Sequence, residues 1–323
     1  MKTVTVTAFG GPEVMVVRDQ PSPEPGEGQV RVAIRAAGVN YADLLQREGL
    51  YPGGPQPPYI AGFEFAGEVE VLGFGVVGWS KGDRVMGMCR DGGYAESVVV
   101  PVASLMKIPD NLGFPEGAAI PCQFLTAYHA LLTLGQLRPG QTVLIQAAAG
   151  GLGTLLVQIA KKVGARVIGT CGTDEKCALI TELGCDHPIN YRDRDFRTEV
   201  MEITNNQGCE LIVESVGGRV FDLSLRCLKP MGRLIVLGVA SKDPRPVYAA
   251  YLLPNNLTVS GFHLSGYLTN REAMANAVRD LYDWTAKGEI RFVVNHQFRL
   301  EEAAEAHRRI AARETSGKVV LLP

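Results

Sequence analysis

Residues 145–153 read IQAAAGGLG, and the run TLLVQIAKKVGARVIGT follows at 154–170. A strand, a glycine-rich turn and a helix in direct succession are typical of a dinucleotide-binding unit, so this stretch decides the fold. Ala148 stands where the usual G-x-G-x-x-G pattern has its first glycine. Gly150 allows a pyrophosphate to approach the backbone, and Gly153 allows the helix to pack closely on the strand. The alternative for the turn taken alone is a helix start without a ligand, and the surrounding pattern favours the cofactor site.

The chain from Pro115 onwards alternates apolar strands with helical periods. We expect strands at 143–145, 166–170, around Ile189, 211–215, 233–238 and 257–261, and helices at 152–163, 176–183, 196–204 and 219–228. Alternation at this spacing predicts an α/β fold with a doubly wound parallel sheet, the Rossmann arrangement. Two amphipathic helices are expected at 270–286 and 300–312.

The first 115 residues read as short β-strands separated by turns rich in glycine and proline, such as PSPEPGEG at 21–28. They predict an all-β domain with one short helix at 41–48. The final GKVVLLP, residues 317–323, reads as a strand that returns to this domain. We therefore expect a β domain made of residues 1–120 and 265–323, with the nucleotide-binding domain inserted at 121–264.

The end of the second strand of the expected sheet distinguishes NADPH from NADH. An NAD site usually places Asp or Glu there, about 20 residues after the glycines, to bind the ribose 2′-hydroxyl. Here that end reads TCGT at 170–173, without an acidic residue, and Lys176 follows. A neutral tip with a nearby cation favours the 2′-phosphate of NADPH. The alternative is a solvated lysine in the first turn of the next helix, beside Asp174 and Glu175.

The composition excludes several classes of protein. At 323 residues the chain is too long for one ordinary core. Its net charge of −2, without a basic block, does not indicate a nucleic-acid partner. The chain contains no run of about 18 uncharged apolar residues, so no membrane span is predicted. Its N-terminus lacks the pattern of a signal peptide. Seven cysteines without a C-x-x-C pair suit free thiols in a reducing cytoplasm.

Four motifs carry a resemblance to a known family: GVNYADLLQREGLYPG (38–53), GDRV (82–85), FLTAYHAL (124–131) and AAAGGLGTLLVQIAKKVGA (147–165). In this order they resemble the zinc-independent medium-chain dehydrogenase/reductases. The chain looks most like the NADPH:quinone oxidoreductase group, with its vesicle amine transport protein and polyketide enoyl reductase relatives. The resemblance covers essentially the whole chain. It implies a Rossmann domain inserted into a GroES-like β domain, and a homodimer joined through the last Rossmann strand, here Leu257–Phe262.

The resemblance also assigns residues to the cofactor. It places Thr126 at the carboxamide and Lys176 with Tyr191 at the 2′-phosphate, which favours the binding role of Lys176. The cofactor-binding residues that it implies are Thr126, Ala149, Gly150, Gly151, Leu152, Gly153, Thr173, Lys176, Tyr191, Leu237, Gly238, Phe262, His263, Leu264, Arg313 and Lys318. Structural alternatives to cofactor binding stay open at two positions. Thr126 could bond back to its own helical turn, and Lys318 could be a solvated lysine on a strand.

Two residues of the β domain are candidate catalytic residues by the same resemblance. Asn40 matches the position that orients substrate or nicotinamide, and Tyr51 matches a tyrosine that serves as a candidate proton donor in enoyl-reductase relatives. A turn-stabilising asparagine and a packing aromatic residue are the structural alternatives. The zinc-dependent members carry metal ligands at the positions of Asn40 and Phe63, and neither side chain binds zinc, so no metal is expected. Glu214 stands where relatives usually have aspartate, and we expect it to pack at the end of its strand.

The resemblance implies hydride transfer from NADPH to a quinone or another conjugated carbonyl compound, without zinc. One alternative is an enoyl-thioester reductase that acts on a 2-enoyl-CoA or acyl-carrier-protein substrate. The other is a protein that binds NADPH without catalysing a reaction. The hydrophobic loops at 40–60 and 240–270 do not encode one acceptor.

Overall fold

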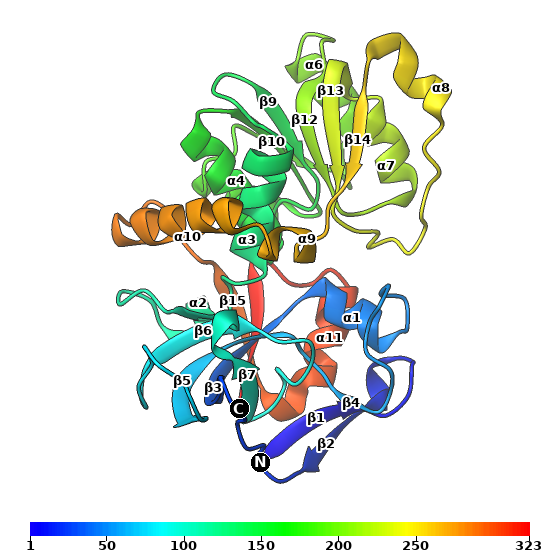
Figure 1. The fold of residues 1–323 in the computed structure, drawn as a ribbon. Coiled ribbons are helices and arrows are strands. Elements are labelled where there is room, and N and C mark those ends of the chain that lie inside the picture. The colour runs from blue at the N-terminus through cyan, green and yellow to red at the C-terminus, as the bar shows by residue number, and fades with distance from the viewer. The chain divides into compact units, whose positions relative to one another are not determined.

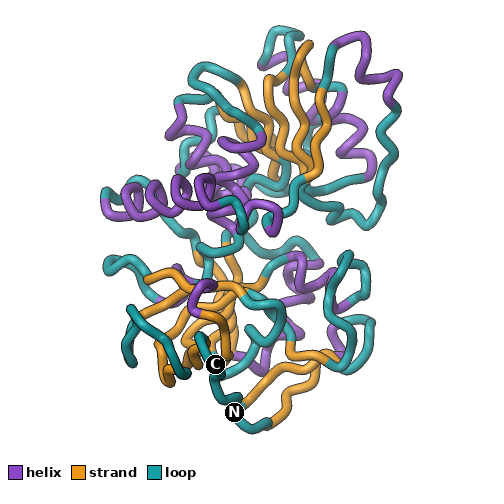
Figure 2. Tube along the Cα trace, viewed as in Figure 1, coloured by secondary structure: helices purple, strands orange, loops and turns teal.

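The glycine-rich turn lies between a strand and a helix, β9 (Thr142–Ile145) and α4 (Gly151–Val163), as the sequence predicts. The computed structural model describes all 323 residues and places β9 inside a six-stranded sheet of order β11-β10-β9-β12-β13-β14. Every pair of neighbouring strands in this sheet is parallel. Figure 1 shows the strands as one twisted sheet, and Figure 2 shows the helices around it. The predicted doubly wound α/β fold is confirmed.

The other strands of the sheet are β10 (Arg166–Cys171), β11 (His187–Asn190), β12 (Cys209–Glu214), β13 (Leu228–Val236) and β14 (Thr258–Gly261). The helices of this part are α3 (Gln123–Tyr128), a π-helix (His129–Leu134), α5 (Asp174–Glu182), α6 (Phe196–Ile203), α7 (Gly218–Leu225), α8 (Ala249–Leu252), a 3₁₀ turn (Leu253–Asn255), α9 (Ser265–Leu268) and α10 (Arg271–Ala286). Leu144, Ile168 and Ile212, from three adjacent strands, are fully buried in its core. Strands covered on both faces require such apolar runs, which is why the sequence predicts this sheet well.

Residues 123–291 form this unit, whereas the sequence analysis ended the nucleotide-binding domain at 264. The difference is α10, which packs on α3 within the same unit. The Tyr128 hydroxyl donates to Asp280 Oδ2 at 2.7 Å, and the Trp284 ring packs against Phe124 and Tyr128. The apolar face of an amphipathic helix shows that the helix covers a core, but not which of two cores it covers. The sequence pattern of α10 therefore could not place the domain boundary after it.

Residues 1–122 and 292–323 form the second unit, which is mostly β-sheet. Its larger sheet contains β3 (Gln29–Val39), β5 (Glu64–Leu72), β6 (Arg84–Met88), β7 (Ser97–Pro101), β8 (Leu105–Lys107), β15 (Val294–Arg299) and β16 (Lys318–Leu322). Its smaller sheet contains β1 (Lys2–Val6), β2 (Met15–Asp19) and β4 (Tyr59–Ile60). Its helices are α1 (Tyr41–Arg47), α2 (Phe114–Gly117) and α11 (Ala303–Ala311), with 3₁₀ turns at Pro12–Val14, Val102–Ser104 and Leu300–Glu302.

The last strand joins the two ends of the chain in one sheet. β16 pairs antiparallel with β3, with Val319 opposite Val39 and Leu321 opposite Ala37. This confirms the expected return of the final residues to the β domain. β15, which pairs parallel with β16, was not expected, because its exposed and half-buried residues show no buried apolar alternation.

None of the helices is long and apolar enough to cross a membrane. All seven cysteines are free thiols in this structure.

Candidate active site

The turn between β9 and α4 leaves the start of α4 open to an anion. No side chain caps α4, and its first turn holds no acidic residue, so nothing in the helix neutralises its positive end. The sharp bend falls on Ala147, at φ +53°, and Ala148 is not among the residues of positive φ. Thr170 supports the bend, because its Oγ1 accepts from the Ala147 N–H at 3.3 Å and its carbonyl accepts from Ala148 at 2.9 Å. A first glycine is therefore not required at 148.

The two glycines of the turn serve different purposes. A Cβ at Gly153 would lie 2.5 Å from the carbonyl carbon of Ala148, so this glycine is needed for close packing of α4 on the turn. A Cβ at Gly150 would meet only the Ala147 carbonyl oxygen, at 3.5 Å, and would otherwise enter open space. A backbone cradle that a side chain would fill fits the pyrophosphate of a dinucleotide.

The tip of β10 gathers the residues predicted for the 2′-phosphate. Thr173 is the N-cap of α5, and its hydroxyl accepts from the Lys176 N–H at 3.3 Å. A Cβ on Gly172 would lie 2.7 Å from the hydroxyl of Tyr191, which places that phenol over the tip. Tyr191 is 38% exposed, so it is accessible to a ligand. Asp174, which could oppose a phosphate, accepts from Asn190 Nδ2 at 2.9 Å.

Arg192 adds a second cation that the sequence analysis missed. The same Cβ position on Gly172 lies 3.7 Å from Arg192 Nε. Burial lowers the pKa of Lys176, and the nearby charge of Arg192 lowers this pKa further. Two cations held close together in this way favour a doubly charged phosphate. In the sequence Arg192 begins the alternating run RDRD, which is typical of a solvated surface, and only its position directly after Tyr191 could have indicated this role.

The remaining cofactor candidates of this unit lie at the same edge of the sheet, except Thr126, which is half-buried on α3. Leu237 and Gly238 follow β13, and the Leu237 N–H donates to the Glu214 carbonyl at 2.7 Å. Phe262, His263 and Leu264 follow β14. Because all six strands are parallel, their carboxyl ends meet at one edge, where ligands of such sheets bind.

An aromatic stack fixes the segment after β14. The Phe262 ring stacks on Tyr267 at 5.1 Å, and Tyr267 stacks on His129 at 4.8 Å. His129 is fully buried, and burial lowers its pKa to about 4, so its ring is neutral at neutral pH. The sequence analysis did not single out His129 or Tyr267, because single aromatic residues in apolar surroundings carry no motif.

Glu214 is fully buried at the end of β12, as expected from its position. Its Oε1 accepts the N–H groups of Val216 and Gly217 at 2.6 and 2.9 Å. Burial raises the pKa of this carboxyl group. Glu214 therefore shapes the turn that follows the strand.

Asn40 lies in the other unit, beside a buried ion pair. Lys318 Nζ contacts Glu64 Oε2 at 2.5 Å and donates to Asn40 Oδ1 at 2.8 Å. Asn40 Nδ2 donates to the same Glu64 oxygen at 2.9 Å. Lys318 is only 1% exposed, so the alternative of a solvated strand lysine is wrong. Glu64 was missed, although a carboxylate between apolar residues in AGFEFAG (61–67) is a signal for a buried polar site.

Tyr51 lies in the loop after α1 and is half-buried. Burial raises the pKa of its phenol, and the neighbouring Cys122 and Asp43 raise it further. The phenol therefore stays protonated at neutral pH. Arg313 follows α11, at φ +60°, with an exposed side chain. It lies in the same unit as Asn40 and Lys318, and its contact with a cofactor stays a prediction.

The residues at the position of a catalytic metal do not fit zinc. The Asn40 amide is engaged by Glu64 and Lys318, and Phe63 offers no ligand atom. No group of three or more His, Cys, Asp or Glu side chains in the structure could hold a metal ion.

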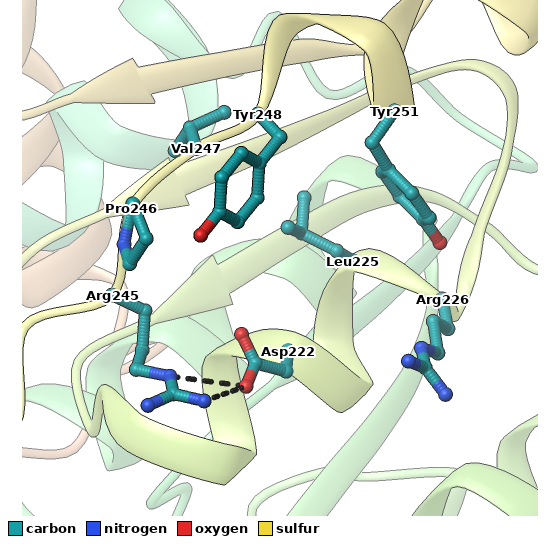
Figure 3. A pocket seen from close by; sticks show the side chains of 8 residues that line it. All are labelled: Asp222, Leu225, Arg226, Arg245, Pro246, Val247, Tyr248 and Tyr251. Atoms are coloured by element: carbon teal, nitrogen blue, oxygen red, sulfur yellow. Dashed lines mark hydrogen bonds and ion pairs between the residues drawn. The ribbon is translucent and has the colours of Figure 1, made fainter.

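The surface also carries a groove apart from these residues. It has a volume of about 340 Å³ and lies between α7 and the segment that leads into α8. Figure 3 shows Tyr248 and Tyr251 above Leu225, with Arg245 bound to Asp222. None of the predicted cofactor or catalytic residues lines it.

Fold and geometry together define the two-domain architecture of a dinucleotide-dependent dehydrogenase. Residues 26–110 match the family model "Alcohol dehydrogenase GroES-like domain", and residues 151–281 match "Zinc-binding dehydrogenase". The chain is 37% identical to a quinone oxidoreductase of Pseudomonas aeruginosa over 100% of this chain and 99% of that protein. It is 36% identical to a 2-haloacrylate reductase of a Burkholderia species, over 97% and 96%.

A solved structure of Escherichia coli quinone oxidoreductase complexed with NADPH superposes with a TM-score of 0.95, at 32% identity and with full coverage of both chains. The chain therefore belongs to the medium-chain dehydrogenase/reductase superfamily, in its quinone oxidoreductase group.

The different surroundings of the two glycines give a paired prediction. Gly153→Ala forces backbone to shift, so we expect a loss of about 1–3 kcal/mol in the free energy of unfolding. Gly150→Ala keeps an extended conformation that any residue adopts, so its stability stays within about 0.5 kcal/mol of wild type. Its methyl group fills the cradle, so dinucleotide affinity falls at least about tenfold. Denaturant unfolding and fluorescence titration measure the two effects, and wild-type affinity in Gly150→Ala would contradict the assignment.

Proposed function

We propose that this protein is an NADPH-dependent reductase that delivers hydride to a quinone or another conjugated carbonyl compound without zinc. The observation that carries the proposal is the carboxyl edge of the parallel sheet. There an uncapped helix start with an open glycine meets a strand tip without an acid, surrounded by Lys176, Arg192 and Tyr191. The relatives named quinone oxidoreductase and 2-haloacrylate reductase support an acceptor with a conjugated double bond.

The residues of the candidate site have separate tasks in such a reaction. NADPH, when bound, supplies the hydride. The amides of the α4 start hold its pyrophosphate, and the β10 tip selects the 2′-phosphate over a hydroxyl group. Tyr51, as a protonated phenol, donates a proton to the carbon skeleton of a reduced enone. Asn40 orients the acceptor. The free thiols support the proposed cytoplasmic location, because disulfides are rare there.

The proposal predicts rapid oxidation of NADPH, and much slower oxidation of NADH, when the purified protein receives 1,4-benzoquinone or an enone. The absorbance of the reduced nicotinamide follows the reaction. Lys176→Met should raise the KM for NADPH about 10- to 100-fold and leave that for NADH within about twofold, because one charge-assisted bond to phosphate is lost. Lys287→Met, which removes a surface ion pair with Asp283, serves as the matched control.

Three results would redirect this assignment. Equal use of NADH would contradict the role of the β10 tip. Turnover of crotonyl-CoA in great excess over quinones and enones would favour the enoyl-thioester reductase. Tight NADPH binding without turnover of any acceptor would favour the non-catalytic protein.

Tyr51→Phe tests the proton donor. Protonation of the carbon skeleton of a reduced enone needs an acid, whereas a reduced quinone is a stabilised oxyanion that water can protonate. We expect enone turnover to fall at least about 100-fold and quinone turnover to stay within about twofold. Tyr59→Phe is the matched control, because the buried Tyr59 hydroxyl has no hydrogen-bond partner. Unchanged enone turnover in Tyr51→Phe would exclude this role.

We also propose that the protein forms a homodimer through β14. This strand is the edge of the parallel sheet, and an open edge is a template for pairing. Large apolar side chains are exposed in nearby segments, among them Leu253 at 74% and Met231 at 77%. Sedimentation velocity should give the mass of two 34.8 kDa chains. Leu253→Asp should weaken the dimer. Val77→Asp, which changes another exposed apolar residue in the other unit, should not. A monomer in the wild type would contradict the proposal.

A further inference from the structure

The contacts of the buried pair between Glu64 and Lys318 determine how Asn40 is held. The two charged side chains are 0% and 1% exposed, and their separation is 2.5 Å. Taking two charges out of water is costly, and many such pairs can be replaced by apolar residues without loss of stability. A pair retained at this depth therefore needs an explanation beyond stability.

The second oxygen of Glu64 makes the pair part of a larger arrangement. Glu64 Oε1 accepts the N–H of Cys122 at 2.6 Å, while Oε2 faces Asn40 Nδ2 and Lys318 Nζ. Both oxygens thus meet donors. Gly38 provides the space, since a Cβ there would lie 2.6 Å from Glu64 Oε2 and 2.8 Å from Lys318 Cε. The backbone of β3 is therefore shaped around this pair.

Asn40 is held by hydrogen bonds to both members of the pair and to Asp43. Its Oδ1 accepts from Lys318, its Nδ2 donates to Glu64, and its backbone N–H donates to Asp43 Oδ2 at 2.8 Å. An asparagine amide has two orientations that differ by a half-turn, with oxygen and nitrogen exchanged. Here the carboxylate accepts only and the ammonium donates only, so a single orientation satisfies both.

We propose that Glu64 and Lys318 are positioning residues for the reduction, which hold the Asn40 amide in the one orientation that orients the acceptor. This inference rests on the proposed function. Glu64 and Lys318 do not contact the acceptor in this proposal. They change the rate only because they hold Asn40. A misplacement of about 1 Å in such a group is enough to lower a rate about 100-fold.

Glu64→Gln tests the proposal with a side chain of the same shape. The amide nitrogen of the new side chain is itself a donor. In one orientation it faces the Cys122 N–H, and in the other it faces Asn40 and Lys318, so one set of donors always loses its acceptor. We expect kcat with saturating NADPH and quinone to fall about 10- to 100-fold, while the KM for NADPH stays within about twofold. With deuterium at the transferred position of NADPH, the isotope effect on kcat should rise, because hydride transfer becomes rate-limiting. If the pair only stabilised the fold, Glu64→Gln would lower the melting temperature and leave kcat and the isotope effect unchanged.

A double-mutant cycle shows whether the effect passes through Asn40. In an Asn40→Ala background, Glu64→Gln should change kcat less than about twofold, since groups that act as one unit are not additive. An effect of equal size with and without Asn40 would overturn the proposal. Glu68→Gln is the matched control, because it breaks an exposed pair with Arg35 on the same two strands and should leave kcat unchanged.

A neutral double variant keeps the test decisive if Glu64→Gln does not fold. Glu64→Gln with Lys318→Met removes both buried charges, so neither charge is left uncompensated. We expect it to fold, as circular dichroism would show, and still to have a kcat at least about tenfold below wild type. A wild-type kcat in this variant would overturn the positioning role of Glu64 and Lys318 and leave the proposed function standing. A wild-type protein that reduces no acceptor would instead overturn the proposed function, and this inference with it.

Discussion

The common direction of six strands is the constraint on which the cofactor site depends. Because every strand of the sheet is parallel, every strand-to-helix turn opens at the same edge. Residues separated by more than 100 positions in the chain, such as Gly150 and Phe262, are brought to this edge by topology alone. No single contact between them is needed. Local details, such as the bend at Ala147 and the packing of Gly153, then adjust the edge to a pyrophosphate.

The β unit differs, because it encloses a buried ion pair beside its apolar core. Its sheet is mixed, and its polar centre joins Asn40, Glu64 and Lys318 with the backbone of Cys122. Cys122 is the last residue before the chain enters the nucleotide-binding unit. Lys318 donates its own N–H to the Val293 carbonyl at 2.7 Å, just after the chain returns. The points where the chain leaves and re-enters this unit are therefore held by the same pair.

Sequence patterns predict what is periodic and miss what is isolated. The apolar strands, the turn with its two glycines and the acid-free β10 tip all follow from rules of spacing, and the structure has them within a few residues of the predicted bounds. Glu64, Arg192 and His129 were missed because each is a single residue whose role depends on neighbours distant in the chain. The boundary at 264 was misplaced for a related reason, since an amphipathic helix such as α10 shows which face is buried and not which core buries it. Lys318 was found only through a family resemblance, and its burial could not be predicted from a strand that reads as apolar.

The pairing of β16 with β3 has a consequence for the order in which the protein can be made. Lys318 follows Glu64 by 254 residues, so a ribosome completes the whole nucleotide-binding unit before the β unit can receive its last strand. During that time residues 37–39 of β3 lack their partner strand, and the Glu64 carboxylate lacks its counter-ion. The nucleotide-binding unit has no such dependence, because all of its strands are consecutive in the chain. Synthesis therefore imposes a sequence in which the inserted unit matures first and the enclosing one waits for the final strand.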